Sequence, residues 1–252
     1  MINNDIAYQF VTPDKSLSDF VERIWMLQNH SDSDKEVVIL PDGSVDLFFT
    51  RSLTDPFHCT LLGIGTQPEK STIKATRTTF AISFKPLSVE YILKESISEL
   101  LNKAKNLAND FWGFTSTDLE DFDLFSKKAT QQIKSILPKE TDHRKHKLFD
   151  LIYNSNGALS VAELSEKVFW GSRQMNRYFN QQYGISLKTY CNIVRFRASF
   201  GHLKEGILFP QQNFSDQAHF IREVRKLAGV NPKQLVLNQN DRFIQFSTLP
   251  ED

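Results

Sequence analysis

Residues 171–190 read GSRQMNRYFNQQYGISLKTY, and residues 216–235 read DQAHFIREVRKLAGVNPKQL. The two segments align without a gap, and the alignment pairs Arg177 with Arg222, Gly184 with Gly229, and Lys188 with Lys233. In each copy a helical pattern stops at a glycine, which adopts the left-handed C-cap conformation at the lowest cost. A capping residue then opens a second helix. The repeat predicts that one supersecondary unit occurs twice.

A further helix is predicted just before the first copy. Ser160 and Glu163 form a capping box, in which each side chain satisfies a backbone amide of the other residue. The apolar positions that follow are spaced three and four apart, and this helix must end before Gly171. Two helices joined by a tight glycine-containing turn are typical of a helix-turn-helix, whose second helix enters the major groove of DNA.

The predicted helix over 172–183 has a polar stripe suited to reading bases. Met175 and Phe179 face the core, and the neighbouring stripe of the helix is polar. This stripe suits base reading because arginine can pair with guanine and asparagine with adenine. The residues that we expect to contact DNA in the first unit are Arg173, Gln174, Asn176, Arg177 and Asn180. Those expected in the second unit, which suits phosphates better than bases, are Gln217, His219, Arg222, Arg225 and Lys226. An ordinary solvated helix face is the competing interpretation.

Charge is distributed unevenly along the chain. Residues 1–140 carry 15 Lys and Arg against 20 Asp and Glu, whereas residues 141–252 carry 15 against 10. A basic half joined to an acidic half suggests that one domain faces a polyanion. Between the repeats, residues 187–204 predict one long helix with apolar groups on two sides, which can hold both units at a fixed separation.

The front half predicts strands followed by helices. Residues 41–44, PDGS, form a turn signal between two apolar runs, so a hairpin is expected there. The expected strands cover 20–28, 36–49, 61–68 and 80–86, and the expected helices cover 91–107 and 123–137. The fold class is therefore α+β: a mixed, barrel-like sheet with following helices, then an all-α domain of two helix-turn-helix units joined by a long helix.

The front half offers few residues for chemistry. Asp42 and Asp46 could be paired carboxylates, but beside the Pro-Asp-Gly turn they are interpreted as turn-forming and surface groups. His30 and His58 lack the converging ligands that a metal needs, so no metal site is expected. An apolar effector pocket would be lined by Trp25, Phe48, Phe84 and Tyr91, and plain core is the alternative for the same residues.

Length and composition place the chain among ordinary globular proteins. Its 252 residues suggest two domains, and 40% hydrophobic with 24% charged residues excludes a disordered or coiled-coil chain. Cys59 and Cys191 are interpreted as reduced thiols in a cytoplasmic protein. The N-terminus, MINNDIAYQF, is not a signal peptide, and no apolar run approaches a membrane span.

Residues 214–235, FSDQAHFIREVRKLAGVNPKQL, resemble the AraC/XylS family of bacterial transcription regulators. The matching positions are Phe214, Asp216, Gln217, His219, Phe220, Arg222, Lys226, Gly229 and Pro232. The first unit also resembles the family's first helix-turn-helix, and the front half is similar to a Bacteroidetes-type sensory domain through PDGSVDLFF, FAISFKP and ISELLNKAKNLANDFWG. One departure is Pro210, which stands where the family's supporting helix should run.

The resemblance implies a sequence-specific DNA-binding transcription regulator with no cofactor and no catalytic activity. The predicted domains are a sensory domain over 1–138, a linker over 139–143, a DNA-binding domain over 144–238 and a tail over 239–252. The expected partners are double-stranded DNA, a small-molecule effector and RNA polymerase, which an activator would contact. We also expect that the chain can form a homodimer and that it does not bind a membrane. Two alternatives are a regulator that binds only a protein partner and a DNA-repair alkyl transferase using Cys59.

Overall fold

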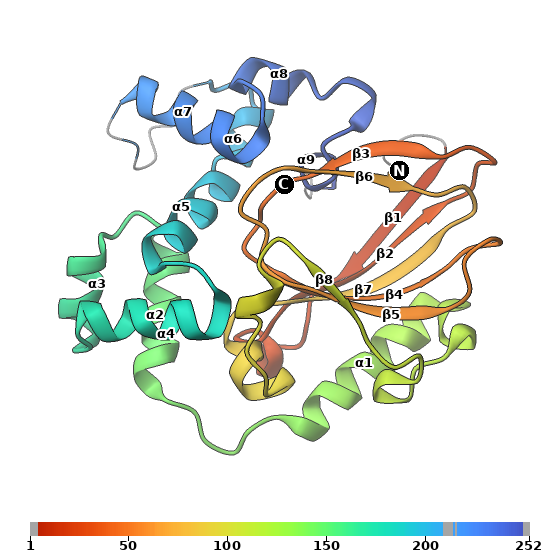
Figure 1. The fold of residues 1–252 in the computed structure, drawn as a ribbon, viewed down its shortest axis with the longest axis horizontal. Helices are drawn as coiled ribbons and strands as arrows, with labels where there is room; N and C mark the ends of the chain where they lie inside the picture. Colours follow the sequence, from red (N-terminus) through yellow and green to blue (C-terminus); the bar gives the residue numbers. More distant parts are fainter. Residues whose placement is uncertain (1–4, 209–213, 215, 249–252) are drawn as a thin grey trace.

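The computed structural model describes residues 5–208, 214 and 216–248 as an α+β protein with two sheets in its front half (Figure 1). The larger sheet has the spatial order β1 (Ile6–Val11), β2 (Val21–Asn29), β7 (Thr78–Phe84), β4 (Val45–Arg51), β5 (His58–Leu62) and β8 (Ala104–Asn106). The smaller sheet pairs β3 (Lys35–Ile39) with β6 (Glu69–Ile73). All of these pairings are antiparallel. The α+β class and the strands expected at 20–28 and 80–86 are confirmed.

The hairpin expected at residues 41–44 does not form. β3 pairs with β6 in the smaller sheet, while β4 lies between β5 and β7 in the larger one. Both edges of β4 are therefore occupied, and the PDGS turn carries the chain from one sheet to the other. Gly43 adopts φ +82°, and a side chain there would lie 3.2 Å from the ring of Tyr190 in the back half. The predicted turn is present, but the strands on either side of it, β3 and β4, do not pair with each other.

The helix expected over 91–107 is also wrong. The chain there forms a short helical turn at Val89–Leu93, a second at Ser98–Leu100, and then strand β8. Lys94 and Asn102 adopt positive φ, which interrupts any continuous helix. Similarly, the strand expected at 61–68 ends at Leu62. The next residue, Gly63, packs against the backbone of Leu100 too closely for any side chain. Tertiary contacts override the helical periodicity here.

Helix α1 (Phe122–Ile136) confirms the helix expected at 123–137 and covers one face of the larger sheet (Figure 1). Phe125 packs against Phe49 of β4 and Phe80 of β7, with ring centroids 5.3 and 5.2 Å apart. The smaller sheet lies on the opposite side of the larger sheet (Figure 1). Because successive strand residues point to opposite faces, Asp46, Phe48 and Thr50 of β4 face the space between the two sheets.

The back half is helical. Its helices are α2 (His143–Asn154), α3 (Val161–Val168), α4 (Ser172–Tyr183), α5 (Leu187–Ala198), α6 (Phe200–Lys204), α7 (Gln217–Ala228), α8 (Pro232–Leu237) and α9 (Ile244–Ser247). The predicted capping box of Ser160 and Glu163 opens α3, and Gly184 and Gly229 end α4 and α7 in the left-handed conformation. Among the described residues, no helix is long and apolar enough to cross a bilayer.

The single helix expected over 187–204 is interrupted at Ser199. There the backbone amide of Ser199 donates to the carbonyl of Phe196, three residues back, and its hydroxyl donates to the same oxygen at 2.6 Å. This local tightening ends α5 and starts the shorter α6. Pro210, which was expected to break a supporting helix, lies outside the described residues.

The two halves share one continuous hydrophobic core. Their junction is also polar: the Tyr183 hydroxyl donates to the carbonyl of Pro86 at 3.1 Å, and the Ile97 amide donates to the carbonyl of Gln182 at 2.9 Å. Arg197 of α5 donates to Glu22 of β2 at 2.7 Å. Burial alone would raise the pKa of Glu22, but Arg197, Lys85 and Arg23 together outweigh it, and the pKa is lowered. The sheet and the helices are therefore in firm contact.

Candidate nucleic-acid interface and ligand cavity

The first helix-turn-helix unit consists of α3 and α4. Phe169 ends α3 in the left-handed conformation, with φ 55°, and the chain turns into α4 at Gly171. The buried face of α4 consists of Met175, Tyr178, Phe179 and Tyr183. Rings from α2, α4 and α5 pack together around Phe179, with centroids 5.1 to 5.8 Å apart. This aromatic packing fixes which face of α4 points outward.

The outward face of α4 carries most of the side chains predicted to read DNA. Arg173, Gln174, Arg177 and Asn180 are exposed. Asn176 differs, because it is half-buried: its Nδ2 donates to the carbonyl of Ser172 at 3.1 Å, and its Oδ1 accepts from the amide of Leu187 at 3.2 Å. Asn176 thus ties α4 to the first residue of α5, so the structure assigns it a structural contact that spacing alone did not indicate.

The second unit places its basic residues on α7. Asp216 caps this helix by accepting from the amide of His219 at 2.7 Å. The predicted contacts Gln217, Arg222, Arg225 and Lys226 are exposed. His219 is half-buried, and its ring packs edge-on against Phe214 at 5.7 Å. Helix α5 lies between α4 and α7 (Figure 1), so one helix contacts both units.

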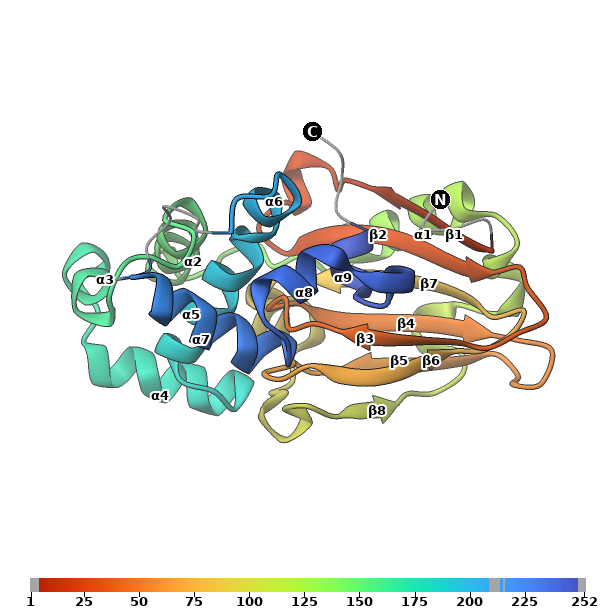
Figure 2. The same ribbon diagram turned by 90° about the horizontal axis from the view of Figure 1, so that it is seen from above.

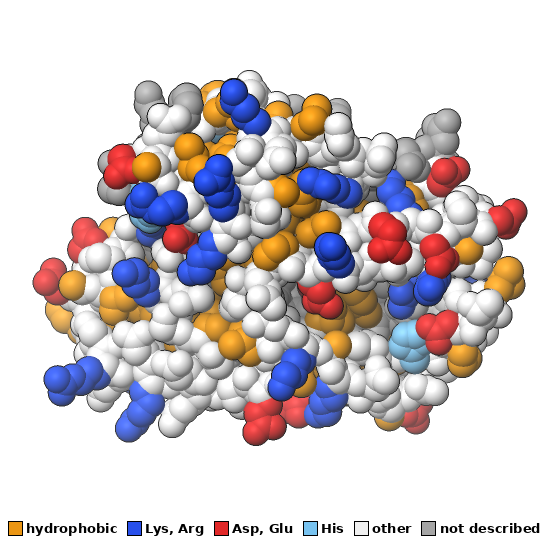
Figure 3. Space-filling view, turned by 45° about the horizontal axis from the view of Figure 1, so that its top comes forward, with side chains coloured by type: hydrophobic (Ala, Val, Ile, Leu, Met, Phe, Trp, Pro, Cys, Tyr) orange, Lys and Arg blue, Asp and Glu red, His pale blue; other side chains and the backbone are white. Residues whose placement is uncertain are grey.

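Charge follows the division into halves on the visible surface. Figure 3 shows Lys and Arg side chains gathered over the helical half, whereas Asp and Glu are denser over the sheet half. Arg173, Arg177, Arg222 and Arg225 all belong to the exposed part of that half. A basic face of this kind attracts a polyanion at long range.

A cavity of about 300 Å³ lies between the two sheets. Apolar side chains from both sheets line it, including Trp25, Phe48, Leu27, Val37, Ile39 and Ile73. Of the four residues predicted to line an effector pocket, Trp25 and Phe48 line this cavity. Phe84 is fully buried in the core instead, and Tyr91 lies at the junction of the halves, where its hydroxyl accepts from the amide of Asp142 at 3.0 Å.

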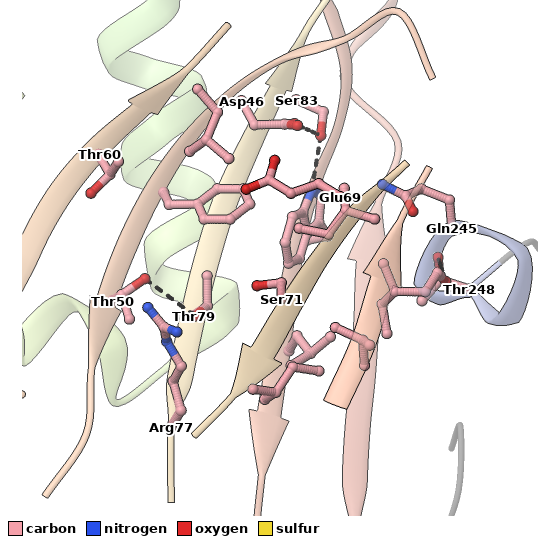
Figure 4. Close-up of a pocket in the computed structure, with 18 of the residues that line it drawn as sticks. Asp46, Thr50, Thr60, Glu69, Ser71, Arg77, Thr79, Ser83, Gln245 and Thr248 are labelled. Carbon is pink, nitrogen blue, oxygen red and sulfur yellow. Dashed lines mark hydrogen bonds between the residues drawn. The ribbon is translucent and has the colours of Figure 1, made fainter. Parts of the chain in front are cut away.

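Polar groups occupy two separate regions of the cavity (Figure 4). In one region, the Ser83 hydroxyl donates to Asp46 at 2.5 Å and accepts from the indole nitrogen of Trp25 at 2.8 Å. Arg77 lies in the other region, near the hydrogen-bonded hydroxyls of Thr50 and Thr79. The cavity therefore combines an apolar middle with anchoring groups that are chemically distinct, as small-molecule sites usually do.

The interpretation of Asp46 as a surface group is wrong, because this residue lines the cavity. Asp42 does form the predicted turn, since its Oδ1 accepts from the amide of Ser44 at 2.9 Å. Asp46 instead faces the cavity beside Phe48, two residues on. The alternation Val45-Asp46-Leu47-Phe48 could have predicted this placement. Val45 and Leu47 are fully buried on one face of the strand, so Asp46 and Phe48 share the other face. Burial and the neighbouring Asp42 carboxylate raise the pKa of Asp46 to about 7.

The raised pKa of Asp46 predicts a pH-dependent stability. The folded protein retains a proton that the unfolded chain releases above pH 4, so the stabilisation present below pH 4 is lost as pH rises through about 7. We expect Asp46→Asn to remove this decline, which amounts to at most about 1.4 kcal/mol per pH unit. Urea midpoints at pH 5 and pH 8 measure it, with exposed Asp123→Asn as the matched control. Identical pH dependence in the wild type and Asp46→Asn would contradict the assignment.

Cys59 is poorly placed for nucleophilic chemistry. Its side chain is fully buried, and burial raises the pKa of the thiol to about 11. Ring Nδ1 of the neighbouring His58 lies 2.9 Å from the carbonyl oxygen of Pro56. Successive residues of a strand point to opposite faces, so His58 does not activate the thiol. Within the described ranges, no three His, Cys, Asp or Glu side chains group as metal ligands.

The chain is similar to known proteins in two ways. A family model described as a domain of unknown function, DUF6597, matches residues 9–105, which contain most of the sheet. No curated protein matches the chain. A 1.65 Å structure of ToxT from Vibrio cholerae is 13% identical, covers 92% of this chain and 98% of its own, and has a TM-score of 0.42. Wild-type ToxT from strain SCE256 with a bound unsaturated fatty acid is 12% identical, covers 96% and 98%, and has a TM-score of 0.42.

Proposed function

We propose that this chain is a sequence-specific DNA-binding transcription regulator of the AraC/XylS type that responds to an effector. In this proposal residues 1–138 sense the effector, 139–143 link the domains, 144–238 bind DNA and 239–252 form a tail. The observation that carries the proposal is the arrangement of α3 and α4, which buries one face of α4 on aromatic rings and leaves Arg173 and Arg177 exposed on the other.

The two units are proposed to contribute differently to DNA binding. The exposed α4 face offers two arginines with Gln174 and Asn180, a combination suited to base edges. The exposed α7 face offers Arg222, Arg225 and Lys226, which suit phosphates. Because phosphate contacts carry little sequence information, we propose that α4 sets most of the specificity and that α7 adds affinity.

The inter-sheet cavity is the proposed effector site. Its apolar walls favour a compact molecule with a hydrophobic body. The carboxylate of Glu69 accepts hydrogen bonds, whereas the carboxyl of Asp46 accepts only when ionised and donates when protonated. A ligand that presents a hydrogen-bond donor to Glu69 is therefore favoured. This chemistry deepens the assignment of Trp25 and Phe48 as effector-pocket residues.

The remaining parts of the proposal concern partners and setting. RNA polymerase and a second copy of the chain are proposed protein partners, and the cytoplasm is the proposed location. We also propose that the protein is not an enzyme and uses no cofactor. The burial of Cys59 argues against alkyl transfer through this thiol.

Genomic DNA selection with the purified full-length protein tests the proposal directly. We expect one recovered motif that spans one or two major-groove segments, and a binding constant that falls with salt. A salt titration on the best site and on a scrambled duplex separates base reading from phosphate contact. Equal affinity for both duplexes at every salt concentration would refute sequence-specific binding, and no binding at low salt would refute DNA binding altogether.

A further inference from the structure

One wall of the cavity does not belong to either sheet. Residues 242–248, here called the tail segment, follow the second helix-turn-helix unit along the chain and include α9. Three of its side chains, Ile244, Gln245 and Thr248, line the cavity. Figure 4 shows Gln245 and Thr248 on the side of the cavity opposite the β4 strand that carries Thr50. The cavity is therefore completed by residues from the C-terminal end of the chain.

The tail segment is attached to the outer edge of β3. The amide of Val38 donates to the carbonyl of Arg242 at 2.5 Å, and Val38 and Phe243 form a parallel bridge. Farther along, the amide of Leu40 donates to Oε1 of Gln245 at 2.7 Å. Phe243 is 1% exposed, so this edge contact is buried as well as hydrogen-bonded. Figure 2 shows α8 leading into α9, which contacts β3.

The same segment is attached to the second helix-turn-helix unit. Asn238, which ends α8, donates to the Ser247 hydroxyl at 2.8 Å and accepts from the amide of Phe243 at 2.9 Å. Phe246 does not line the cavity, and its ring packs edge-on against Phe200 of α6 at 5.6 Å. Residues of one short helix thus face the cavity at Ile244 and the helical half at Phe246.

We infer that the effector site is composite, with the tail segment as its closing wall, and that an occupant of the cavity holds the second helix-turn-helix unit against the sheets. This inference rests on the proposed function. An occupant gains contacts with Ile244, Gln245 and Thr248 only while the tail segment is docked on β3. A molecule that binds one of two conformations better shifts the equilibrium toward it. By linkage, undocking of the tail segment weakens binding in the cavity by the same factor.

Hydrogen exchange on full-length variants tests the inference without knowledge of the natural ligand. Ser71→Trp places an indole in the cavity from β6, and Lys70→Trp on the neighbouring, exposed position is the matched control. We expect amide exchange over 242–248 to slow about tenfold in Ser71→Trp relative to Lys70→Trp, because the indole stabilises the docked segment. Unchanged or faster exchange there overturns the inference. Ser71→Leu replaces the tryptophan variant if circular dichroism shows that the latter does not fold.

A second variant tests the path from the cavity to the helices. In Ser71→Trp we also expect slower exchange over 217–228, in α7. Adding Phe246→Ala should abolish that effect while the effect over 242–248 persists, because Phe246 contacts Phe200 but not the cavity. An α7 effect that survives Phe246→Ala overturns the path. Because exchange is measured without DNA, a protein that fails to bind DNA yet shows these changes refutes the proposed function and leaves this inference standing.

Discussion

The double variant Arg173→Ala, Arg177→Ala is expected to bind its selected DNA site roughly 30-fold to 20,000-fold more weakly than the wild type. A bidentate arginine–guanine contact provides about 1–3 kcal/mol of discrimination, and two such contacts account for this range. Both side chains are exposed on α4, whose opposite face is held by the aromatic cluster, so their removal should leave the fold intact. Titration on the selected duplex and on a scrambled one measures the loss.

Two comparisons show whether the arginines read bases or only neutralise phosphates. Arg173→Lys with Arg177→Lys keeps both charges but removes the planar fork, so we expect sequence preference to fall while the salt dependence stays nearly constant. Arg222→Ala in α7 should weaken binding to both duplexes by a similar factor. If Arg177→Ala and Arg222→Ala reduced base preference equally, the proposed division of labour between α4 and α7 would be wrong.

Phe179→Ala is expected to lower the free energy of unfolding by about 3–5 kcal/mol. Phe179 is fully buried and contacts rings from α2, α4 and α5, so its removal leaves a cavity in the aromatic cluster. Phe169→Ala, in the same helix-turn-helix, is the matched control: its side chain is 86% exposed, and we expect a change below about 0.5 kcal/mol. Urea unfolding monitored by circular dichroism compares the two.

A small effect of Phe179→Ala would mean that the α4 packing is looser than the structure shows. The result also bears on the interface, because the cluster determines which α4 residues face outward. A variant that stays folded but repacks the cluster should lose base preference even though Arg173 and Arg177 are unchanged.

Local signals made the helical half predictable. The capping box at Ser160, the left-handed glycines Gly184 and Gly229, and Pro232 at the start of a helix each act within a few residues, and all three occur as expected. These motifs satisfy backbone groups of their own helix, so distant parts of the chain have little influence on them. The outward placement of Arg177 follows from the same periodicity.

The front half depended on contacts that no short segment reveals. The PDGS turn predicted a reversal correctly, but the partners of β3 and β4 were set by competition among all the strands. The segment 91–107 has helical periodicity, yet it meets the end of α4, where the Ile97 amide finds the carbonyl of Gln182. Asp46 looked like a turn residue because its neighbour Asp42 is one, although strand alternation placed it beside Phe48 in the cavity.

The polar contacts of asparagine are similarly hard to foresee. Spacing placed Asn176 on the same stripe as Arg173, and nothing in the local sequence shows that the amide of Leu187, eleven residues later, needs an acceptor. A side chain at the edge of a predicted interface can contact either DNA or the next helix of the protein. Asn176 contacts the next helix, α5.

The shared core has a practical meaning for dissecting the molecule. Tyr178 and Tyr183 are buried on α4, and their hydroxyls bond to Glu90 and to the carbonyl of Pro86 in the front half. A fragment containing only residues 144–238 would expose these rings, and the apolar surface around them, to water. Such a fragment would be prone to self-association. Its affinity for DNA would therefore differ from that of the same residues in the whole chain. The two halves share one core, so exchanging the front half for another domain would also require a new partner for that face of α4.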